Sequence, residues 1–371
     1  MLLALVGGVC AAVVGYLLQN NIELLREVGV TGLFVPDAVA LRDTAKVFWE
    51  IRFDLNATWR PIIGVMLLYG VGVFWGALAV CGLNILLIVI AAYYFLKVIK
   101  FLVNDDRYLL LIFFFVMISV VGNIYLIEVM AFPNKEIPLM AITNAYMYHL
   151  TVRRNYILAL VLSFIAITFR DGYGLILIGC MGVVWGLQNR PTNARVVLVA
   201  SIAAILSLFP ISNFVEFSSI LERNTEVSLE SSGHFSYFSK LVYNTVSLGL
   251  LNSFKAEDGR LYLLNVGFWQ FGVFIISGVL WALKGSLRET TEVENNISMI
   301  IIITLLGISY GSYIQPRYLM PLLYFFVFGF VRCIGGRRIA LLSSIAIPVI
   351  LLLSHHSVGV SEVGNDVSWS W

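Results

Sequence analysis

Long apolar stretches, separated by short polar or charged segments, follow one another along the whole chain. Stretches of about 20 predominantly apolar residues are typical of helices that cross a membrane. The pattern therefore predicts about eleven membrane-spanning helices. The predicted spans are residues 2–18, 77–99, 108–130, 138–150, 156–169, 172–188, 195–211, 262–283, 298–314, 318–332 and 338–354.

The apolar stretch 61–99 has two interpretations, because it carries no charged side chain before Lys97. It forms either two helices that turn at Gly82-Leu83-Asn84, or one span preceded by a re-entrant or interfacial helix. We count it as one span. The stretches 138–150 and 156–169 are short for a crossing, which favours broken or tilted helices beside a cavity.

The composition supports a membrane protein. Of the 371 residues 60% are hydrophobic and 12% are charged, whereas soluble domains carry about 25% charged residues. The 24 basic and 22 acidic side chains are too few to cover the surface of a soluble protein of this size. This excludes a soluble enzyme, a nucleic-acid-binding protein and a disordered chain. We expect an all-α, polytopic helical bundle in a single domain, residues 1–371.

Basic residues are distributed unevenly between the two sides of the predicted bundle. Three stand on one side, at Lys135, Arg170 and Arg317, and twelve lie in the short loops of the other. Because short cytoplasmic loops collect lysine and arginine, the side with twelve is predicted to be cytoplasmic. Loops 21–60 and 212–261 then lie outside; counting 61–99 as two spans would place 21–60 inside. The twelve are Lys97, Lys100, Arg107, Arg153, Arg154, Arg190, Arg195, Lys284, Arg288, Arg332, Arg337 and Arg338.

Each of the three outer basic residues belongs to a short motif, and a cation near a helix end of an apolar protein is costly unless it has a use. Each also has a structural interpretation: Lys135 and Glu136 as an exposed turn pair, or Arg170 and Asp171 as a local ion pair. Arg317 has no acidic residue within ten positions. The motifs are Pro133-Asn134-Lys135-Glu136, Arg170-Asp171-Gly172-Tyr173 and Pro316-Arg317-Tyr318.

If these cations converge, they would form a site for pyrophosphate. Guanidinium groups bind phosphate oxygens in a bidentate manner, which makes arginine well suited to this task. The natural diphosphate on the outer face of a bacterial membrane is a polyprenyl carrier. The sequence thus predicts a diphosphate site that includes Arg170, Arg317 and Lys135.

The two long outer loops hold further candidates. Loop 21–60 has amphipathic helical spacing and carries Asp37 and Arg42; Asp37 either caps a helix or acts as a base or sugar ligand. Loop 212–261 mixes acidic and aromatic residues around His234 and Tyr237. Such a mixture suits either carbohydrate binding or an interfacial helix with an aromatic belt. A histidine can serve in acid–base catalysis.

The chain resembles the Wzy-type polymerases, including EpsG-like members, which assemble O-antigen or capsular polysaccharide. The resemblance rests on the apolar chain of this size, the large late outer loop, and the motifs Arg170-Asp171-Gly172 and Pro316-Arg317-Tyr318. The early Pro36-Asp37 loop and the Asn134-Lys135-Glu136 turn also fit this family and the wider GT-C glycosyltransferases. The resemblance implies a GT-C-like fold in the bacterial inner membrane.

The resemblance further implies transfer of a growing glycan from undecaprenyl diphosphate to a lipid-linked repeat unit, at the outer face and without metal or cofactor. Arg170 and Arg317 would bind the diphosphate, and Asp37, Asp171, Glu136 or His234 would assist the acceptor hydroxyl. Lys135, Tyr173, Tyr318, Arg42 and Tyr237 would contact substrate. The expected partners are the lipid-linked glycan, membrane lipid and a chain-length regulator; no nucleic acid is expected.

Two other functions remain open from the sequence. The first is a GT-C enzyme that adds one sugar from a polyprenyl phosphate, which would require an essential acid such as Asp37. The second is a flippase for lipid-linked oligosaccharide, for which short and even loops would be typical.

Overall fold

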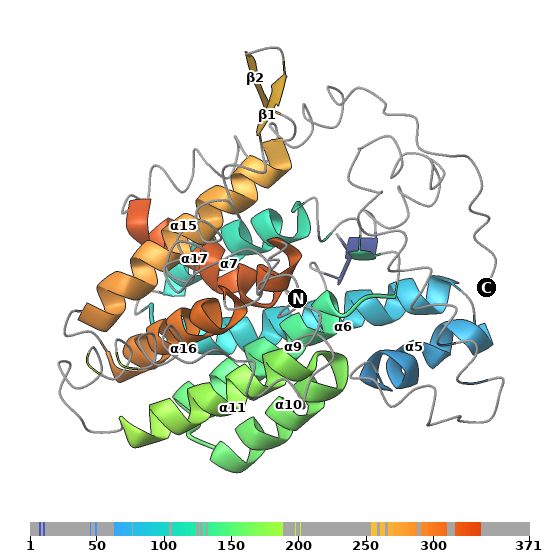
Figure 1. The fold of residues 1–371 in the computed structure, drawn as a ribbon, viewed down its shortest axis with the longest axis horizontal. Helices are drawn as coiled ribbons and strands as arrows, with labels where there is room; N and C mark the ends of the chain where they lie inside the picture. The colour runs from blue at the N-terminus through green and yellow to red at the C-terminus, as the bar shows by residue number, and fades with distance from the viewer. Residues whose placement is uncertain are drawn as a thin grey trace, which may run out of the picture.

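Helices form almost all of the part of the chain that the computed structural model describes (Figure 1). One short hairpin of two strands is the exception within that part. The predicted all-α class is therefore confirmed for the described residues, with this hairpin added. The structure describes residues 7–8, 10–11, 45, 49, 63–75, 77–103, 106–123, 126, 129–130, 133–187, 197, 201, 254–257, 260–263, 266–287, 291–309 and 316–334.

Most of the described elements are α-helices. Two of the helices are of another type: η1 is a π-helix and η4 is a 3-10 helix. The elements are α5 (Ile63–Trp75), α6 (Ala77–Ile99), α7 (Asp106–Val121), α9 (Glu136–Met147), η1 (Tyr148–Val152), α10 (Tyr156–Phe169), α11 (Asp171–Gly186), β1 (Phe254–Glu257), β2 (Arg260–Leu263), α15 (Val266–Leu287), α16 (Glu292–Ser309), η4 (Pro316–Leu322) and α17 (Leu323–Ile334).

Helices occupy eight of the eleven predicted spans, and α10 has the predicted bounds 156–169. The other three, 2–18, 195–211 and 338–354, lie largely or wholly outside the described residues. By length and composition, one described segment, Leu78–Ile99 of α6, is long and apolar enough to cross a membrane. Six other apolar helices in the described part are shorter.

Several predicted bounds are wrong. The stretch 262–283 begins inside β2, which pairs antiparallel with β1, and its helix starts only at Val266. In the stretch 108–130, α7 ends at Val121 and a turn follows at Gly122, whereas Leu126, Val129 and Met130 are helical again. The stretch 318–332 begins as a 3-10 turn that contains Pro321, because proline lacks the N–H that a continuous α-helix uses. In Figure 1 the hairpin projects beyond the helices at the start of α15.

The stretch 61–99 is one long helix with a shorter one before it. α6 runs unbroken through Gly82, Leu83 and Asn84, so the alternative with a turn at these residues is wrong. α5 packs beside α6, and the Tyr69 hydroxyl donates a 2.6 Å hydrogen bond to Asn84 Oδ1. Tyr69 and Asn84 lie seven and eight positions from residue 76, so α5 folds back along the first part of α6. It also contacts the end of α10.

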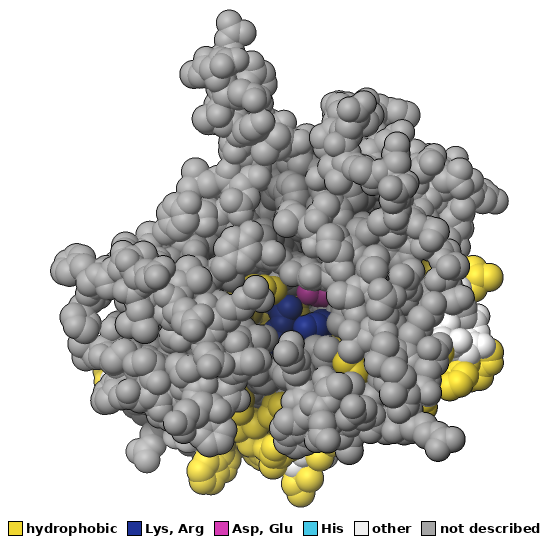
Figure 2. All heavy atoms as spheres, turned by 45° about the vertical axis from the view of Figure 1, so that its right-hand side comes forward, with side chains coloured by type: hydrophobic (Ala, Val, Ile, Leu, Met, Phe, Trp, Pro, Cys, Tyr) yellow, Lys and Arg dark blue, Asp and Glu magenta, His cyan; other side chains and the backbone are white. Residues whose placement is uncertain are grey.

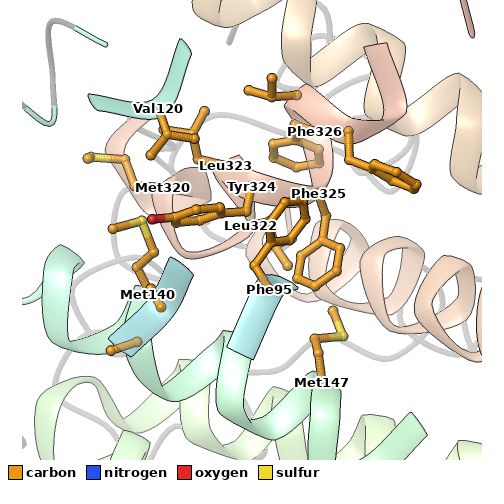
Figure 3. Close-up of a cluster of buried hydrophobic side chains, with 14 of the residues drawn as sticks. Phe95, Val120, Met140, Met147, Met320, Leu322, Leu323, Tyr324, Phe325 and Phe326 are labelled. Atoms are coloured by element: carbon orange, nitrogen blue, oxygen red, sulfur yellow. The ribbon is translucent and has the colours of Figure 1, made fainter. Parts of the chain in front are cut away.

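The core between α6, α9 and α17 is aromatic (Figure 3). The Phe95 ring of α6 lies 5.1 Å from that of Tyr324 and 5.6 Å from that of Phe325, measured between centroids. All three residues are fully buried. Met140 and Met147 approach the same cluster from α9 (Figure 3). This packing holds α17 against α6, and η4 lies against α9.

Polar contacts join several helices at one end of the bundle. Glu294, in the first turn of α16, accepts a 2.9 Å hydrogen bond from Trp281 Nε1 and pairs with Arg332 at 3.7 Å. Arg332 also donates to the carbonyl of Leu102 just after α6. We call this the basic end. The basic residues with described side chains at this end are Lys97, Lys100, Arg153, Arg154, Lys284 and Arg332, six of the twelve predicted to share one side.

Helices α15 and α17 touch through glycine. A Cβ added at Gly329 would lie 2.7 Å from the Cα of Gly278, which is closer than such atoms approach.

We expect Gly329→Ala to lower the free energy of unfolding by about 1–3 kcal/mol, since the helices must separate. The measurement is SDS-induced unfolding in mixed micelles.

The matched control is Gly182→Ala in α11, where an added Cβ has no atom of the described residues within 4 Å. This change should leave stability unchanged or raise it by about 0.5–1 kcal/mol, because alanine favours the helix. Equal losses in the two variants would contradict the close packing of α15 and α17.

Candidate functional site

The three motifs with outer basic residues come together in the structure. Arg170 Nη2 lies 3.5 Å from Glu136 Oε1 in an ion pair. The same guanidinium lies over the ring of Tyr318, 4.2 Å from its centroid. Glu136 begins α9, Arg170 joins α10 to α11, and Tyr318 belongs to η4. We call this group, with Lys135, the arginine site.

Glu136 is held by two different partners, one for each carboxylate oxygen. Oε1 faces Arg170, and Oε2 accepts a 3.0 Å hydrogen bond from the backbone N–H of Lys135. Only 7% of the Glu136 side chain is exposed. The interpretation of Lys135 and Glu136 as an exposed turn pair is therefore wrong for Glu136.

Arg170 is a single extended residue between two helices, with φ −159° and ψ 106°. Its N–H ends α10 by donating to Ala166, and its carbonyl accepts from the N–H of Gly174 in α11. A Cβ at Gly174 would lie 2.7 Å from the Ser163 carbonyl oxygen, so glycine lets α11 turn back closely against α10. The sharp reversal places Arg170 at the tip of both helices.

The Arg170 side chain is only 18% exposed. Its ion pair with Glu136 occupies one side of the guanidinium, and no further hydrogen bond reaches the group from any described residue. A guanidinium carries five N–H donors in a planar fork. The Arg170 guanidinium can therefore bind a phosphate while it keeps its contact with Glu136 and its position over Tyr318.

Tyr173 lies deeper than the ion pair. It is 2% exposed, and its hydroxyl lies 2.9 Å from Thr143 Oγ1 of α9. Thr143 in turn donates to the Leu139 carbonyl. Tyr173 was predicted to contact substrate, but the structure places it as a packing residue that fastens α11 to α9 directly below Arg170.

The structure describes the backbone of two further candidates. Asp171 is the first residue of α11, and Arg317 is the second residue of η4, next to Tyr318. Their side chains lie outside the described part. Four more candidates, Asp37, Arg42, His234 and Tyr237, lie wholly outside it.

Three helices begin at the arginine site, namely α9, α11 and η4. The first N–H groups of a helix have no partner within it and give that end a partial positive charge. At the start of α9 the N–H groups of Lys135 and Ile137 are already bonded to the side chains of Glu136 and Asn134. Among the described side chains, the Arg170 guanidinium therefore offers donors for an anion with several oxygen atoms.

The arginine site and the basic end lie at opposite ends of α9–η1. α9 begins at Glu136, and η1 ends at Val152 just before Arg153. Their 12 and 5 residues span about 25 Å at ~1.5 Å per residue. α6, with 23 residues, is about 10 Å longer and runs past the site. Arg170 and Glu136 are thus set back from the tip formed by α5 and α6.

Figure 2 brings forward the side of the molecule on which α5 lies. Basic and acidic side chains lie next to each other there, in a hollow of this face, with apolar side chains beside them. Charged side chains inside a hollow are less exposed to water than those on a flat surface, so their interaction with a ligand is stronger.

No protein-family model, no curated protein and no solved structure matches the chain. Among the described residues, no three His, Cys, Asp or Glu side chains gather where they could hold a metal ion.

Sequence reasoning missed the polar residues that support the site. Asn84 of α6 and Asn134 before α9 are buried, and each bonds a backbone carbonyl of the segment that leads to Glu136. A single asparagine inside an apolar run, such as Asn84, is a usable signal, because an amide in an apolar helix needs a partner.

The two ion pairs of different exposure allow a direct test. We expect Glu136→Gln to lower the free energy of unfolding by about 3 kcal/mol, because it leaves the nearly buried Arg170 without its countercharge. Glu292→Gln removes the partner of Arg154, where the two side chains are 37% and 49% exposed. That loss should stay below about 1 kcal/mol.

Unfolding by SDS in mixed micelles measures both changes. The double variant Glu136→Gln with Arg170→Gln should recover part of the loss, since no charge is then left unpaired. If Glu136→Gln costs no more than Glu292→Gln, the ion pair of the arginine site does not contribute as described.

Proposed function

We propose that this chain is a polytopic, GT-C-like membrane protein of about eleven spans, with the arginine site facing the outside of the bacterial inner membrane. The segregation of six basic residues at the other end supports this orientation, because lysine and arginine collect on the cytoplasmic side. α5 lies beside the start of α6 and does not reach the basic end, which favours 61–99 as a single crossing. The loop 21–60 would then lie outside.

We further propose that the protein polymerises undecaprenyl-diphosphate-linked oligosaccharide repeat units into O-antigen, capsule or exopolysaccharide. The observation that carries this proposal is the meeting of Arg170, Glu136 and Tyr318 at the end opposite the basic end. A partly buried arginine with N–H donors that no described residue binds, set back from the tip of the bundle, suits a diphosphate whose lipid tail stays in the membrane.

In the proposed reaction, an acceptor hydroxyl of one lipid-linked unit attacks the anomeric carbon of the growing glycan on another. A new glycosidic bond forms, the bond from the anomeric carbon to the diphosphate oxygen breaks, and undecaprenyl diphosphate leaves with the electron pair. The proton of the hydroxyl passes to a base, for which Asp171, Asp37 and His234 are the candidates.

The roles of the described residues follow from charge. Negative charge grows on the diphosphate as it leaves, and Arg170 is placed to stabilise it together with Arg317. Glu136 orients Arg170 through the ion pair, and the Tyr318 ring supports the face of the guanidinium. No described step requires a metal or a cofactor.

Variants at the two ends of the bundle test the proposal. Arg170→Ala and Arg317→Ala should abolish long polysaccharide, and Arg170→Lys should restore little, since an ammonium group lacks the planar fork. Loss of one transition-state charge contact lowers rates by about 10²–10³-fold. The measurement is the length distribution of polysaccharide from cells that express each variant.

Arg154→Ala is the matched control, because Arg154 also forms an ion pair but lies at the basic end. It should leave chain lengths as in the wild type, at equal amounts of inserted protein. Normal chain lengths in Arg170→Ala, or equal losses in Arg154→Ala and Arg170→Ala, would refute the proposal.

A further inference from the structure

Asn84 is an amide within the apolar helix α6, and it is fully buried. Both halves of its side chain are used: Oδ1 accepts the hydrogen bond from the Tyr69 hydroxyl at 2.6 Å, and Nδ2 donates to the Met130 carbonyl at 2.9 Å. The amide thus ties α5 and α6 to the segment before α9. An unpaired amide in this environment would be costly, so these bonds define the position of that segment.

A second asparagine binds the neighbouring carbonyl. Asn134 Nδ2 donates to the Val129 carbonyl at 2.9 Å, and its Oδ1 accepts from the N–H of Ile137 at 2.8 Å, in the first turn of α9. Two successive carbonyls, of Val129 and Met130, are therefore each held by a buried asparagine. The bonds to the Val129 and Met130 carbonyls hold the chain before α9, and the bond from Ile137 N–H to Asn134 holds its first turn.

This start carries the residues of the arginine site. Glu136 follows Asn134 by two positions, and its Oε2 is bound by the N–H of Lys135 inside the same fixed segment. Since Oε1 faces Arg170, any shift of the start of α9 moves the carboxylate relative to the guanidinium. A chain of contacts therefore leads from Tyr69 through Asn84 to Glu136 and Arg170.

We propose that Asn84 is a positioning residue of the arginine site, which sets the orientation of Arg170 toward a diphosphate through the Met130 carbonyl and Glu136. Tyr69 assists it by holding the Asn84 carbonyl oxygen. This inference rests on the proposed function, because it assumes that Arg170 binds a diphosphate. It adds two residues, on α5 and α6, that make no described contact with Arg170.

The experiment measures binding of undecaprenyl diphosphate to the purified full chain in lipid nanodiscs. We expect Asn84→Leu to raise Kd at least about tenfold and Tyr69→Phe to raise it less, because Asn84→Leu also breaks the bond to the Met130 carbonyl, which Tyr69→Phe leaves in place. The matched control is Thr151→Val, which removes a buried hydroxyl bond at the far end of the same α9–η1 unit and should leave Kd unchanged.

A double variant separates positioning from general stability. If Asn84 acts through Glu136, then Asn84→Leu should have little further effect on Kd in a Glu136→Gln background. If the two effects multiply, or if Asn84→Leu and Tyr69→Phe bind like the wild type, the positioning role is overturned. Tyr69→Phe keeps the test decisive where Asn84→Leu does not fold.

Failure of the proposed function gives a different result. If the wild type does not bind undecaprenyl diphosphate, or if Arg170→Ala binds it as tightly as the wild type, the diphosphate site itself is refuted. If the wild type binds, Arg170→Ala binds weakly and Asn84→Leu binds normally, only the role of Asn84 is refuted.

Discussion

The ion pair between Arg170 and Glu136 joins the turn between α10 and α11 to the start of α9. It lies in a chain with few charged residues. In apolar surroundings neither group is stable alone, so each requires the other. The requirement fixes α9 against the junction of α10 and α11. Tyr318 brings η4 to the same point through its ring. Three chain segments far apart in the sequence thus meet around one guanidinium.

Helix length decides how deep this meeting point lies. α10 has 14 residues and spans about 21 Å, less than the ~30 Å of a bilayer's hydrocarbon core. α9 with η1 spans about 25 Å by the same measure. In the proposed orientation the arginine site therefore sits below the outer surface, where a lipid-linked diphosphate could reach it without leaving the membrane. A substrate that enters from the water phase would not require a site at this depth.

The apolar pattern predicted the bounds of α10. The distribution of basic residues pointed to Lys135, Arg170 and Arg317 as parts of one site. It did not predict that Glu136 is the partner of Arg170, since no local rule links residues 34 positions apart. A turn at Gly82-Leu83-Asn84 was one of two interpretations of the apolar stretch 61–99, and Asn84 instead lies inside α6, where it makes a tertiary hydrogen bond. The π-helix after α9 and the strand pairing before α15 likewise depend on contacts outside any local window.

The most direct measurement of the central claim uses the purified protein in liposomes with an undecaprenyl-diphosphate-linked oligosaccharide as the only substrate. The account predicts a ladder of lipid-linked products that lengthens by whole repeat units, and its absence with Arg170→Ala. A product with a single added sugar from a polyprenyl phosphate donor would contradict the account, as would movement of the lipid between leaflets with no change in glycan length.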